Sequence, residues 1–298
     1  MAIITISKVS FSEGGEVAGK VAHRLGYRSA SNEVILEASR IFQTPQSKLD
    51  RAIHAAPSVF DRFFSVKQKH LAYVTAVALE QFKNDDVVYY GSAGQFFARR
   101  ISPMTPRILA YFKKDNVVYD GFAEEYYARK IAHLLNVRII AHLEDRVRLL
   151  MKKQNMSRQH ATKVLEKEDH ARNAWSRHFF GVDHTDHSLY DLVIQMNKLT
   201  VDDAVDLICE TVAKPRFRTS PESQQAVEDL ALAAGIKAAL FNDYPGCEVV
   251  AEKKSIEIYV RFTLHTDTMI SEKIRQKVLK IPGVSSVSVI LIPSVLFT

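Results

Sequence analysis

The chain has 298 residues, of which 47% are hydrophobic and 25% charged, and its formal net charge is +6. This composition excludes a wholly disordered, collagen-like or low-complexity chain, and the length predicts about two domains. The mild positive charge suits a phosphate-bearing ligand and a polynucleotide equally, so it does not distinguish between these two ligand classes.

Cysteine content and hydropathy bound the cellular setting. Cys209 and Cys247 are too few for a disulfide framework or a cysteine-based zinc site. The N-terminal segment is too short and too polar beyond Ile6 to form the core of a signal peptide. No apolar run approaches the roughly 20 residues that span a bilayer. We therefore expect a cytoplasmic protein without a transmembrane segment.

Apolar patterns predict strands alternating with helices along the first part of the chain. A buried strand at 2–6 is followed by small and glycine residues and then by a helix that ends near Gly26. Residues 33–83 show only helical spacing, which predicts three or four helices. The remaining strands and helices are expected at 137–141, 143–151, 152–180, 190–196 and 199–212. This alternation predicts a parallel sheet covered on both faces.

An internal duplication lies within this pattern. Residues 82–101 and 112–131 align, and each copy predicts a strand, a glycine-containing turn and a helix. Two copies are too few for a solenoid. The favoured interpretation is that the duplication adds one strand–helix unit to the sheet. Alternatively, one copy occupies the sheet and the other packs outside it, and the sequence does not say which copy lines a site.

The sequence changes character after residues 214–221, a basic segment flanked by prolines that we interpret as a linker. Ile256, Ile258 and Val260 alternate with polar residues, which predicts a strand with one buried face. The expected order is helix 222–241, strands 247–252 and 255–264, helix 269–281 and strand 284–292. We predict a small α+β (αββαβ) C-terminal domain over 222–298.

The turn that leaves the first strand is the strongest candidate for binding chemistry. Ser10, Ser12 and the glycines that follow precede a helix whose N–H groups and dipole favour an anion. Gly14…Gly19-Lys20-Val21 nearly matches the phosphate-loop spacing, but Val21 lacks the hydroxyl that binds magnesium, and the match lies too far into the helix. A plain strand–helix turn is the alternative interpretation.

The segment SKVSFSEGGEVAGKVAHRLGYR resembles the opening of the bacterial cytidylate kinase-like family, S-R-Q-x-G-S-G-G-R-E-I-A and then a helix ending L-G-Y. Phe11 and Glu13 stand where the family has glycines, and Gly15 stands where it has arginine. Phe11 restricts the backbone, and the Glu13 carboxylate repels phosphates. The positions that match outright are Ser7, Ser12, Gly14, Glu16 and Ala18, and Lys8 replaces arginine.

Later segments resemble the same family in the expected order. VRIIAHLEDRVRLLM is similar to the family's strand, alanine and arginine-bearing helix, which fits Arg146. Asp169, Arg172 and Trp175 match the lid pattern D-x-x-R-x-x-aromatic. SLYDLVIQMNKLTVDDAVDLI is close to the family's S-L-Y-D-L-V-I segment and is the most specific of the matches.

The resemblance implies a P-loop NTPase-type domain over 1–213, with a helical monophosphate-binding insert at 33–80 and a lid at 146–180. It implies transfer of the γ-phosphoryl group of ATP, with Mg²⁺, to a nucleoside monophosphate such as CMP or dCMP. The implied ATP-binding residues are Ser10, Ser12, Glu13, Gly14, Gly15 and Glu16. The implied catalytic residues are Lys8, Arg146, Arg158, Asp169 and Arg172.

Departures from the family pattern support a second hypothesis. The family's Gly-Arg near the monophosphate site is replaced by Gly91-Ser92 in one copy of the duplication and by Gly121-Phe122 in the other. The alternative function is therefore a nucleotide-binding pseudokinase that acts as a sensor. The lid charges also suit an ordinary solvated helix. A nucleic-acid partner is not expected, because no continuous basic face is evident.

Residues 181–187 (GVDHTDH) hold two histidines and two aspartates that suggest a metal site. Ligands on a loop are poorly preorganised, so we interpret this segment as a polar hinge and predict no metal ligands.

The C-terminal unit resembles the BON domain through its strand alternation and through KIPGVSSVSVIL, which is similar to the module's V-x-G-V-x-x-V ending. This resemblance implies a module that binds phospholipid or a protein partner. Ordinary solubility explains its surface lysines equally well; they are Lys253, Lys254, Lys273, Lys277 and Lys280.

Overall fold

The computed structural model describes residues 2–30, 32–54, 64–90, 131–180, 183–262 and 269–293. A five-stranded sheet lies at the centre of the first part of the chain, in the order β2-β3-β1-β4-β5. Every neighbouring pair in it is parallel. Its strands are β1 (Ile3–Lys8), β2 (Arg28–Ala30), β3 (Val87–Tyr90), β4 (Leu134–Ile140) and β5 (Leu192–Gln195). The expected parallel sheet is confirmed, and the three-residue edge strand β2 is an addition.

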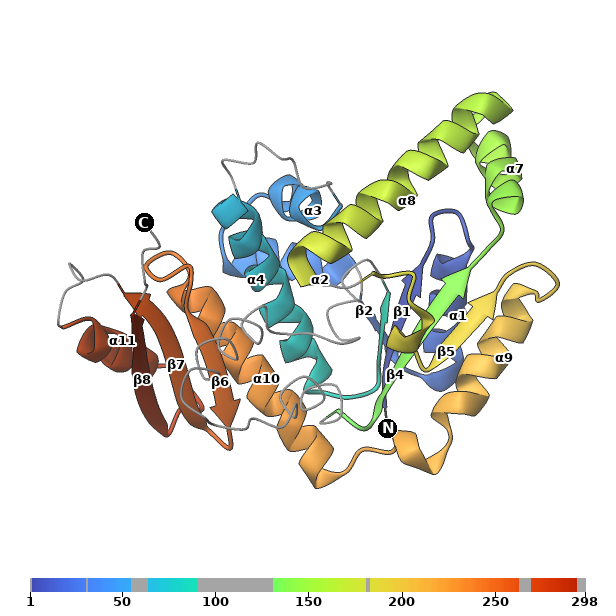
Figure 1. Ribbon diagram of the computed structural model, residues 1–298. Coiled ribbons are helices and arrows are strands. Elements are labelled where there is room, and N and C mark those ends of the chain that lie inside the picture. The colour runs from blue at the N-terminus through green and yellow to red at the C-terminus, as the bar shows by residue number, and fades with distance from the viewer. Residues whose placement is uncertain are drawn as a thin grey trace, which may run out of the picture.

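Helices cover both faces of this sheet (Figure 1). Ile4 and Ile6 of β1 point into a core formed with α1 and α9, whereas Ile3 points into a second core built around α4. This alternation follows from the two-residue period of a strand and accounts for its unbroken apolar run. The helices of this part are α1 (Gly14–Leu25), α2 (Asn32–Ile41), α3 (Gln46–His54), α4 (Phe64–Phe82) and α9 (Val201–Val212).

The first copy of the duplication supplies a central strand. β3 pairs with β1 on one side and with β2 on the other. The second copy, apart from its last residue, Ile131, lies outside the described residues. The choice between an added sheet unit and an outside copy therefore stays a prediction.

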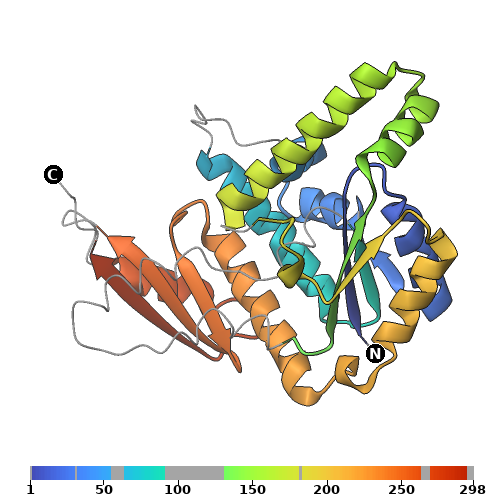
Figure 2. The same ribbon diagram turned by 45° about the vertical axis from the view of Figure 1, so that its right-hand side comes forward.

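Two long helices form an arm over the carboxyl ends of the strands. α7 (Leu143–Gln154) leaves β4 directly, and α8 (Arg158–Phe180) returns from the far end of the arm toward the sheet (Figures 1 and 2). A small apolar core holds them together, and its buried members are Val147, Leu150, Ala161 and Leu165. At its inner end α8 is anchored by Trp175, whose indole N–H donates to the Ala52 carbonyl at 2.9 Å.

A separate three-stranded sheet forms the C-terminal unit. β6 (Glu248–Glu252) pairs antiparallel with β7 (Ser255–Phe262), which pairs parallel with β8 (Ser286–Pro293). α10 (Pro221–Leu240) and α11 (Ile270–Val278) complete the expected order of helix, two strands, helix and strand. α10 contacts both β6 and α4, so one helix belongs to the cores of both units (Figure 1).

The segment interpreted as a linker packs against the first unit. Residues Pro215–Phe217 form a short 3-10 turn, and Phe217 is buried in the core beneath α9. Thr219 donates a short hydrogen bond to Asp85. His133, fully buried, lies 2.7 Å from the Ser223 hydroxyl through Nδ1 and 3.3 Å from Asp85 through Nε2. These polar contacts join the start of α10 to the amino ends of β3 and β4.

Among the described residues, no helix combines the length and the apolar composition that crossing a lipid bilayer requires.

Asp85 gives this junction a pH dependence. Burial opposes its ionisation, but His133 and Thr219 prevail and hold the pKa of Asp85 below its usual range. The stabilisation is therefore complete above the unfolded-state pKa of about 3.9 and is lost as the pH falls through the lower folded-state pKa. We expect Asp85→Asn to lower the free energy of unfolding at pH 7 by about 1–3 kcal/mol. Urea unfolding from pH 7 to pH 3 measures this.

The control for this prediction is Glu210→Gln, which changes an exposed carboxylate on α9. It should leave the unfolding curve at pH 7 unchanged. A constant difference between wild type and Asp85→Asn down to pH 3 would contradict the assignment.

Candidate functional site

The turn between β1 and α1 has a backbone that glycine normally adopts. Phe11 and Glu13 have φ angles of 58° and 60°, in the left-handed region. An L-residue there costs roughly 1–2 kcal/mol. The Ser12 hydroxyl donates to the Val9 carbonyl at 2.8 Å and closes the turn from within. The turn therefore has the shape expected of a glycine-rich loop although two of its residues carry side chains.

The backbone donors at the end of this turn are available to a ligand. In the part of the chain that the structure describes, no acceptor is found for the N–H groups of Glu13, Gly14 and Gly15. Glu13 is the N-cap of α1, and no side chain caps that helix end. Successive N–H groups in residues of alternating handedness converge on one point, where a helix dipole adds positive potential. The turn can thus accept an anion the size of a phosphate.

The two substituted side chains differ in their surroundings. Phe11 is partly buried against the apolar core between α7 and α8. Glu13 is exposed, and Glu16 lies along the outer face of α1, 3.4 Å from Lys20. The aromatic ring thus attaches the turn to the arm. Of the residues expected to bind ATP, Glu16 is not brought to the turn.

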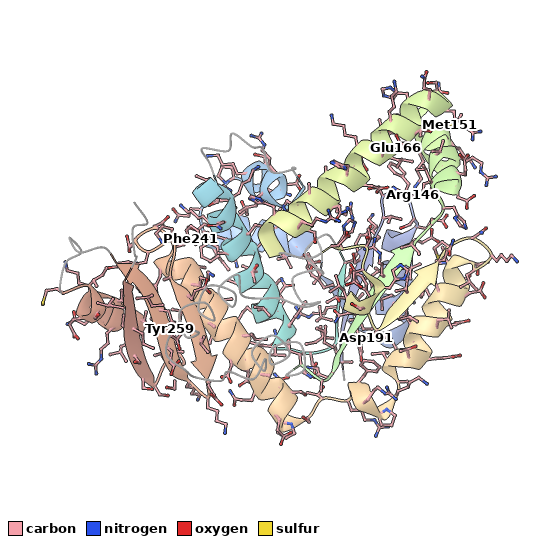
Figure 3. The ribbon with its side chains drawn as sticks, viewed as in Figure 1. Arg146, Met151, Glu166, Asp191, Phe241 and Tyr259 are labelled. Atoms are coloured by element: carbon pink, nitrogen blue, oxygen red, sulfur yellow. The ribbon has the colours of Figure 1, made fainter. Side chains whose placement is uncertain are left out.

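Arg146 links the arm to the turn. Arg146 lies in the first turn of α7, shortly after β4 ends, and its side chain is buried (Figure 3). Its Nε donates to the Ser10 carbonyl at 2.7 Å, and its two terminal nitrogens reach the carboxylate of Asp169 at 2.7 and 2.9 Å. The two-pronged pair with Asp169 on α8 fixes the guanidinium in one plane.

Arg172 reaches the same turn from α8, and the carboxylates of Asp169 and Glu168 act on its charge without pairing closely with it. It donates to the Lys8 carbonyl at 2.6 Å and to the Ser10 hydroxyl at 3.4 Å. No carboxylate of the described residues forms an ion pair with it at short distance. Burial lowers the pKa of Arg172, and burial followed by the charge of Arg172 lowers the pKa of Lys8. Buried cations that lack a close ion pair favour an anionic ligand.

Arg138 is a cationic residue that the sequence analysis missed. It lies on β4, is 2% exposed, and donates to the His184 carbonyl at 2.6 Å and the Tyr190 hydroxyl at 3.0 Å. Burial and, as the second-largest cause, the positive charge of Arg138 lower the pKa of His184 to about 4, so this imidazole is neutral at pH 7. A charged residue inside the apolar strand VRIIA was the available signal, because such a position requires a specific partner.

Arg158 and the Asp183 segment do not contribute to this turn. Arg158 begins α8, about 21 Å along the helix from Arg172, and pairs with Glu144 at 2.6 Å. The structure does not bring Arg158 to the turn. Asp183 is engaged by Arg177 and Thr185, and no group of metal-binding side chains occurs among the described residues.

Comparison with known proteins places this geometry in a family. The profile of the Cytidylate kinase-like family matches residues 3–198, well over half of the chain. The chain belongs to the cytidylate kinase-like family. A search of the curated proteins finds no match.

Solved structures with a similar course of the chain include several kinases. An uncharacterized protein from Eubacterium ventriosum is 16% identical, with 71% of this chain and 98% of that chain covered and a TM-score of 0.44. Shikimate kinase from Bacteroides thetaiotaomicron is 11% identical, with coverages of 71% and 98% and a TM-score of 0.38. Deoxyadenosine kinase from M. mycoides, solved with dCMP and dCDP, is 13% identical, with coverages of 70% and 98% and a TM-score of 0.33.

The cytidylate kinase-like pattern explains why the turn has its shape. The family's glycines correspond to Phe11 and Glu13, the two left-handed residues. Gly14 matches the pattern outright, and a Cβ atom there would lie 3.0 Å from the Cβ of Lys8. This chain therefore adopts, at the two positions where the family pattern has glycine, a backbone that strains a residue with a side chain.

Glu13 allows the strain and the charge to be tested separately. Glu13→Gly should raise the free energy of unfolding by about 0.5–1 kcal/mol, because glycine adopts the left-handed conformation without a clash. It should also tighten the binding of inorganic phosphate, because a repelling carboxylate is lost. Glu13→Gln is the matched control: it removes the charge and keeps the strain, so it should improve only phosphate binding. Thermal unfolding and calorimetric titration measure the two effects. If the Glu13→Gly variant were no more stable than the Glu13→Gln variant, the turn would not be strained at this residue.

Proposed function

We propose that this chain is a nucleoside monophosphate kinase of cytidylate type, which transfers the γ-phosphoryl group of Mg-ATP to CMP or dCMP. The observation that carries the proposal is the turn from Ser10 to Gly15, whose available N–H groups lie where two arginines of the arm meet the chain. In such a transfer an acceptor phosphate oxygen bonds to the γ-phosphorus while the bond to the β,γ-bridging oxygen breaks and ADP leaves. The protein contributes position and positive charge rather than a covalent nucleophile.

The residues present fit the phosphates of ATP. Lys8, Arg146 and Arg172 surround the turn, and Arg138 adds a fourth positive charge beneath it. Only Asp169 forms a close ion pair with any of the four among the described residues. The surplus positive charge complements a polyphosphate.

Mg²⁺ would arrive on ATP, since magnesium in such sites keeps several waters and is held through substrate phosphates. Bound there, it would neutralise charge on the transferring group. The Ser12 hydroxyl donates to Val9, which leaves its oxygen lone pairs as the acceptors that the turn offers nearby.

In this proposal each charged side chain has its own task. Arg172 binds the transferring phosphoryl group, because it reaches the turn and has no close carboxylate partner. Asp169 orients Arg146, which keeps Ser10 in place through its carbonyl. Arg158 remains at the outer part of the arm and would contribute only after the arm moves. The helices at 33–80 would hold the monophosphate acceptor.

The second candidate is a nucleotide-binding pseudokinase. The observations that favour it are the glycine at residue 15, where the family has arginine, and the pairing of Arg146 with Asp169, which partly cancels its charge. In this function the turn binds a nucleotide without transferring phosphate, and α10 passes the bound state to the C-terminal unit.

A coupled assay for ADP release with CMP, dCMP and UMP as acceptors separates the two candidates. Wild type should turn over CMP or dCMP with ATP. Arg172→Ala should lower kcat by about a hundredfold or more, because a donor to the transition state is lost.

Lys163→Ala is the control for Arg172→Ala, because Lys163 is an exposed cation on the same helix. It should keep full activity. Wild type that binds Mg-ATP calorimetrically but turns over none of the acceptors would support the pseudokinase instead.

We also propose that residues 222–298 form a BON-like module that contacts an acidic lipid surface. Its support is the element order and the turn between β6 and β7, where Lys253 and Lys254 are both exposed. Their φ angles of 45° and 72° belong to a hairpin turn that usually carries asparagine and glycine. The Asp229 carboxylate of α10 accepts from the Lys253 N–H at 2.9 Å and fastens the turn to that helix.

Vesicle co-sedimentation tests the lipid contact. The full chain should bind vesicles that contain phosphatidylserine and not vesicles of phosphatidylcholine alone. The double variant Lys253→Glu/Lys254→Glu should lose this binding, because each lysine contributes about 1 kcal/mol at an anionic surface. Lys198→Glu, an exposed change in the first unit, is the control. Equal binding to both vesicle types, or to neither, would contradict the contact with an acidic lipid surface and leave a protein partner to be tested.

A further inference from the structure

The first observation concerns the space beside Gly15. A Cβ atom at this residue would lie 3.0 Å from the hydroxyl oxygen of Tyr90 and 3.2 Å from its Cζ, tight contacts that would require the ring to shift by a few tenths of an ångström. Tyr90, at the end of β3, therefore fills the volume in which a side chain at residue 15 would begin. The family pattern has arginine at residue 15, so this chain has exchanged a cation on the turn for a ring next to it.

The second observation concerns the course of the Lys8 side chain. A Cβ atom on Gly14 would lie 3.0 Å from the Lys8 Cβ and 3.4 Å from its Cδ, so the lysine stem runs directly along Gly14. Its Nζ then lies 4.6 Å from the centre of the Tyr90 ring. The ammonium is thus held between the first turn of α1 and the ring that occupies the space beside Gly15.

The third observation is that this ammonium has no close ion pair, although the Glu168 carboxylate acts on it from a greater distance. Among the described residues, no carboxylate is within ion-pair distance of the Lys8 Nζ. Burial, and then the charge of Arg172, lowers the pKa of Lys8. A partly desolvated ammonium that rests on an aromatic face is attracted both by the ring and by any anion at the adjacent helix end.

We infer that Lys8 and Tyr90 together replace the basic side chain that the family carries at residue 15. Lys8 supplies the positive charge for the phosphates of a nucleoside triphosphate, and Tyr90 is the positioning residue whose ring holds that charge at the start of α1. This inference rests on the proposed nucleotide binding and adds the residue pair on which the affinity for the triphosphate depends.

The proposal assigns the effect to the Tyr90 ring and not to its hydroxyl. A purely structural role for Tyr90 would act on stability and would be independent of Lys8. A positioning role requires instead that the effects of changing Tyr90 and Lys8 on nucleotide affinity be coupled, because they act through one ammonium.

The experiment is calorimetric titration of the full chain with Mg-ATP. Lys8→Met keeps the apolar stem and removes the charge, and we expect it to weaken binding about tenfold. Tyr90→Leu should weaken binding about fivefold, whereas Tyr90→Phe, which keeps the ring, should bind as wild type. The double variant Lys8→Met/Tyr90→Leu should bind no more weakly than Lys8→Met alone.

A rescue tests the exchange directly. Gly15→Arg alone should weaken binding, because the new side chain meets the Tyr90 ring. In Gly15→Arg/Tyr90→Leu the space is open, and the arginine should restore the affinity lost in Tyr90→Leu.

Each outcome decides a distinct claim. Independent, multiplicative losses in the double variant, or a Tyr90→Phe variant as weak as Tyr90→Leu, would overturn the positioning role. Wild-type affinity in Lys8→Met would overturn the role of the lysine while leaving nucleotide binding intact. Wild type that binds no Mg-ATP would overturn the proposed function together with this inference.

Discussion

The conformation of six residues, from Ser10 to Gly15, determines what the rest of this molecule can do. Two of them are held in a backbone region that their side chains disfavour. The local hydrogen bonds are that of the Ser12 hydroxyl and those from the first turn of α1 to the Glu13 carbonyl. The conformation persists because elements far apart in the sequence hold it. Arg146 donates to the Ser10 carbonyl and Arg172 to the Lys8 carbonyl. The Phe11 ring packs against the apolar core between α7 and α8. Tertiary contacts thus offset the local strain.

The same contacts make the arm an electrostatic part of the site. Each arginine that holds the turn also brings positive charge to it, so the structural and the binding roles of these side chains are linked. Arg146 is neutralised by Asp169 and serves mainly to fix the geometry. Arg172 forms no close ion pair among the described residues, and in the proposed function its charge acts on the bound phosphates. Arg146 therefore stabilises the turn, whereas in the proposed function Arg172 supplies the charge that binds a phosphate.

Periodicity and ordered motifs predicted the sheet, its flanking helices and the order of elements in the C-terminal unit, because burial imposes those patterns directly on sequence. They missed β2, which is three residues long and half exposed, so it leaves no apolar run. For the site, the motif residues Lys8, Arg146, Asp169 and Arg172 do meet at one turn. Arg158 does not, since helical spacing fixes the face of a residue but not its height above a loop in another element. The Glu16 side chain lies along the exposed face of α1 toward Lys20, a direction that the motif does not specify. Arg138 left one signal, a charge inside an apolar strand, but its partners and those of Tyr90 are brought near only by the fold.

The helix α10 sets a further constraint on how the two units relate. Val227, Leu230 and Ala231 complete the core around α4, while Ile236 and Leu240 of the same helix belong to the C-terminal core. A rigid helix shared in this way transmits displacement from one core to the other, because neither side can repack without losing buried area. Its first turn is tied to β3 and β4 through Asp85, His133 and Ser223. β3 ends at Tyr90, beside the turn that follows β1. One helix and one strand therefore connect the C-terminal sheet to the residues around Gly15.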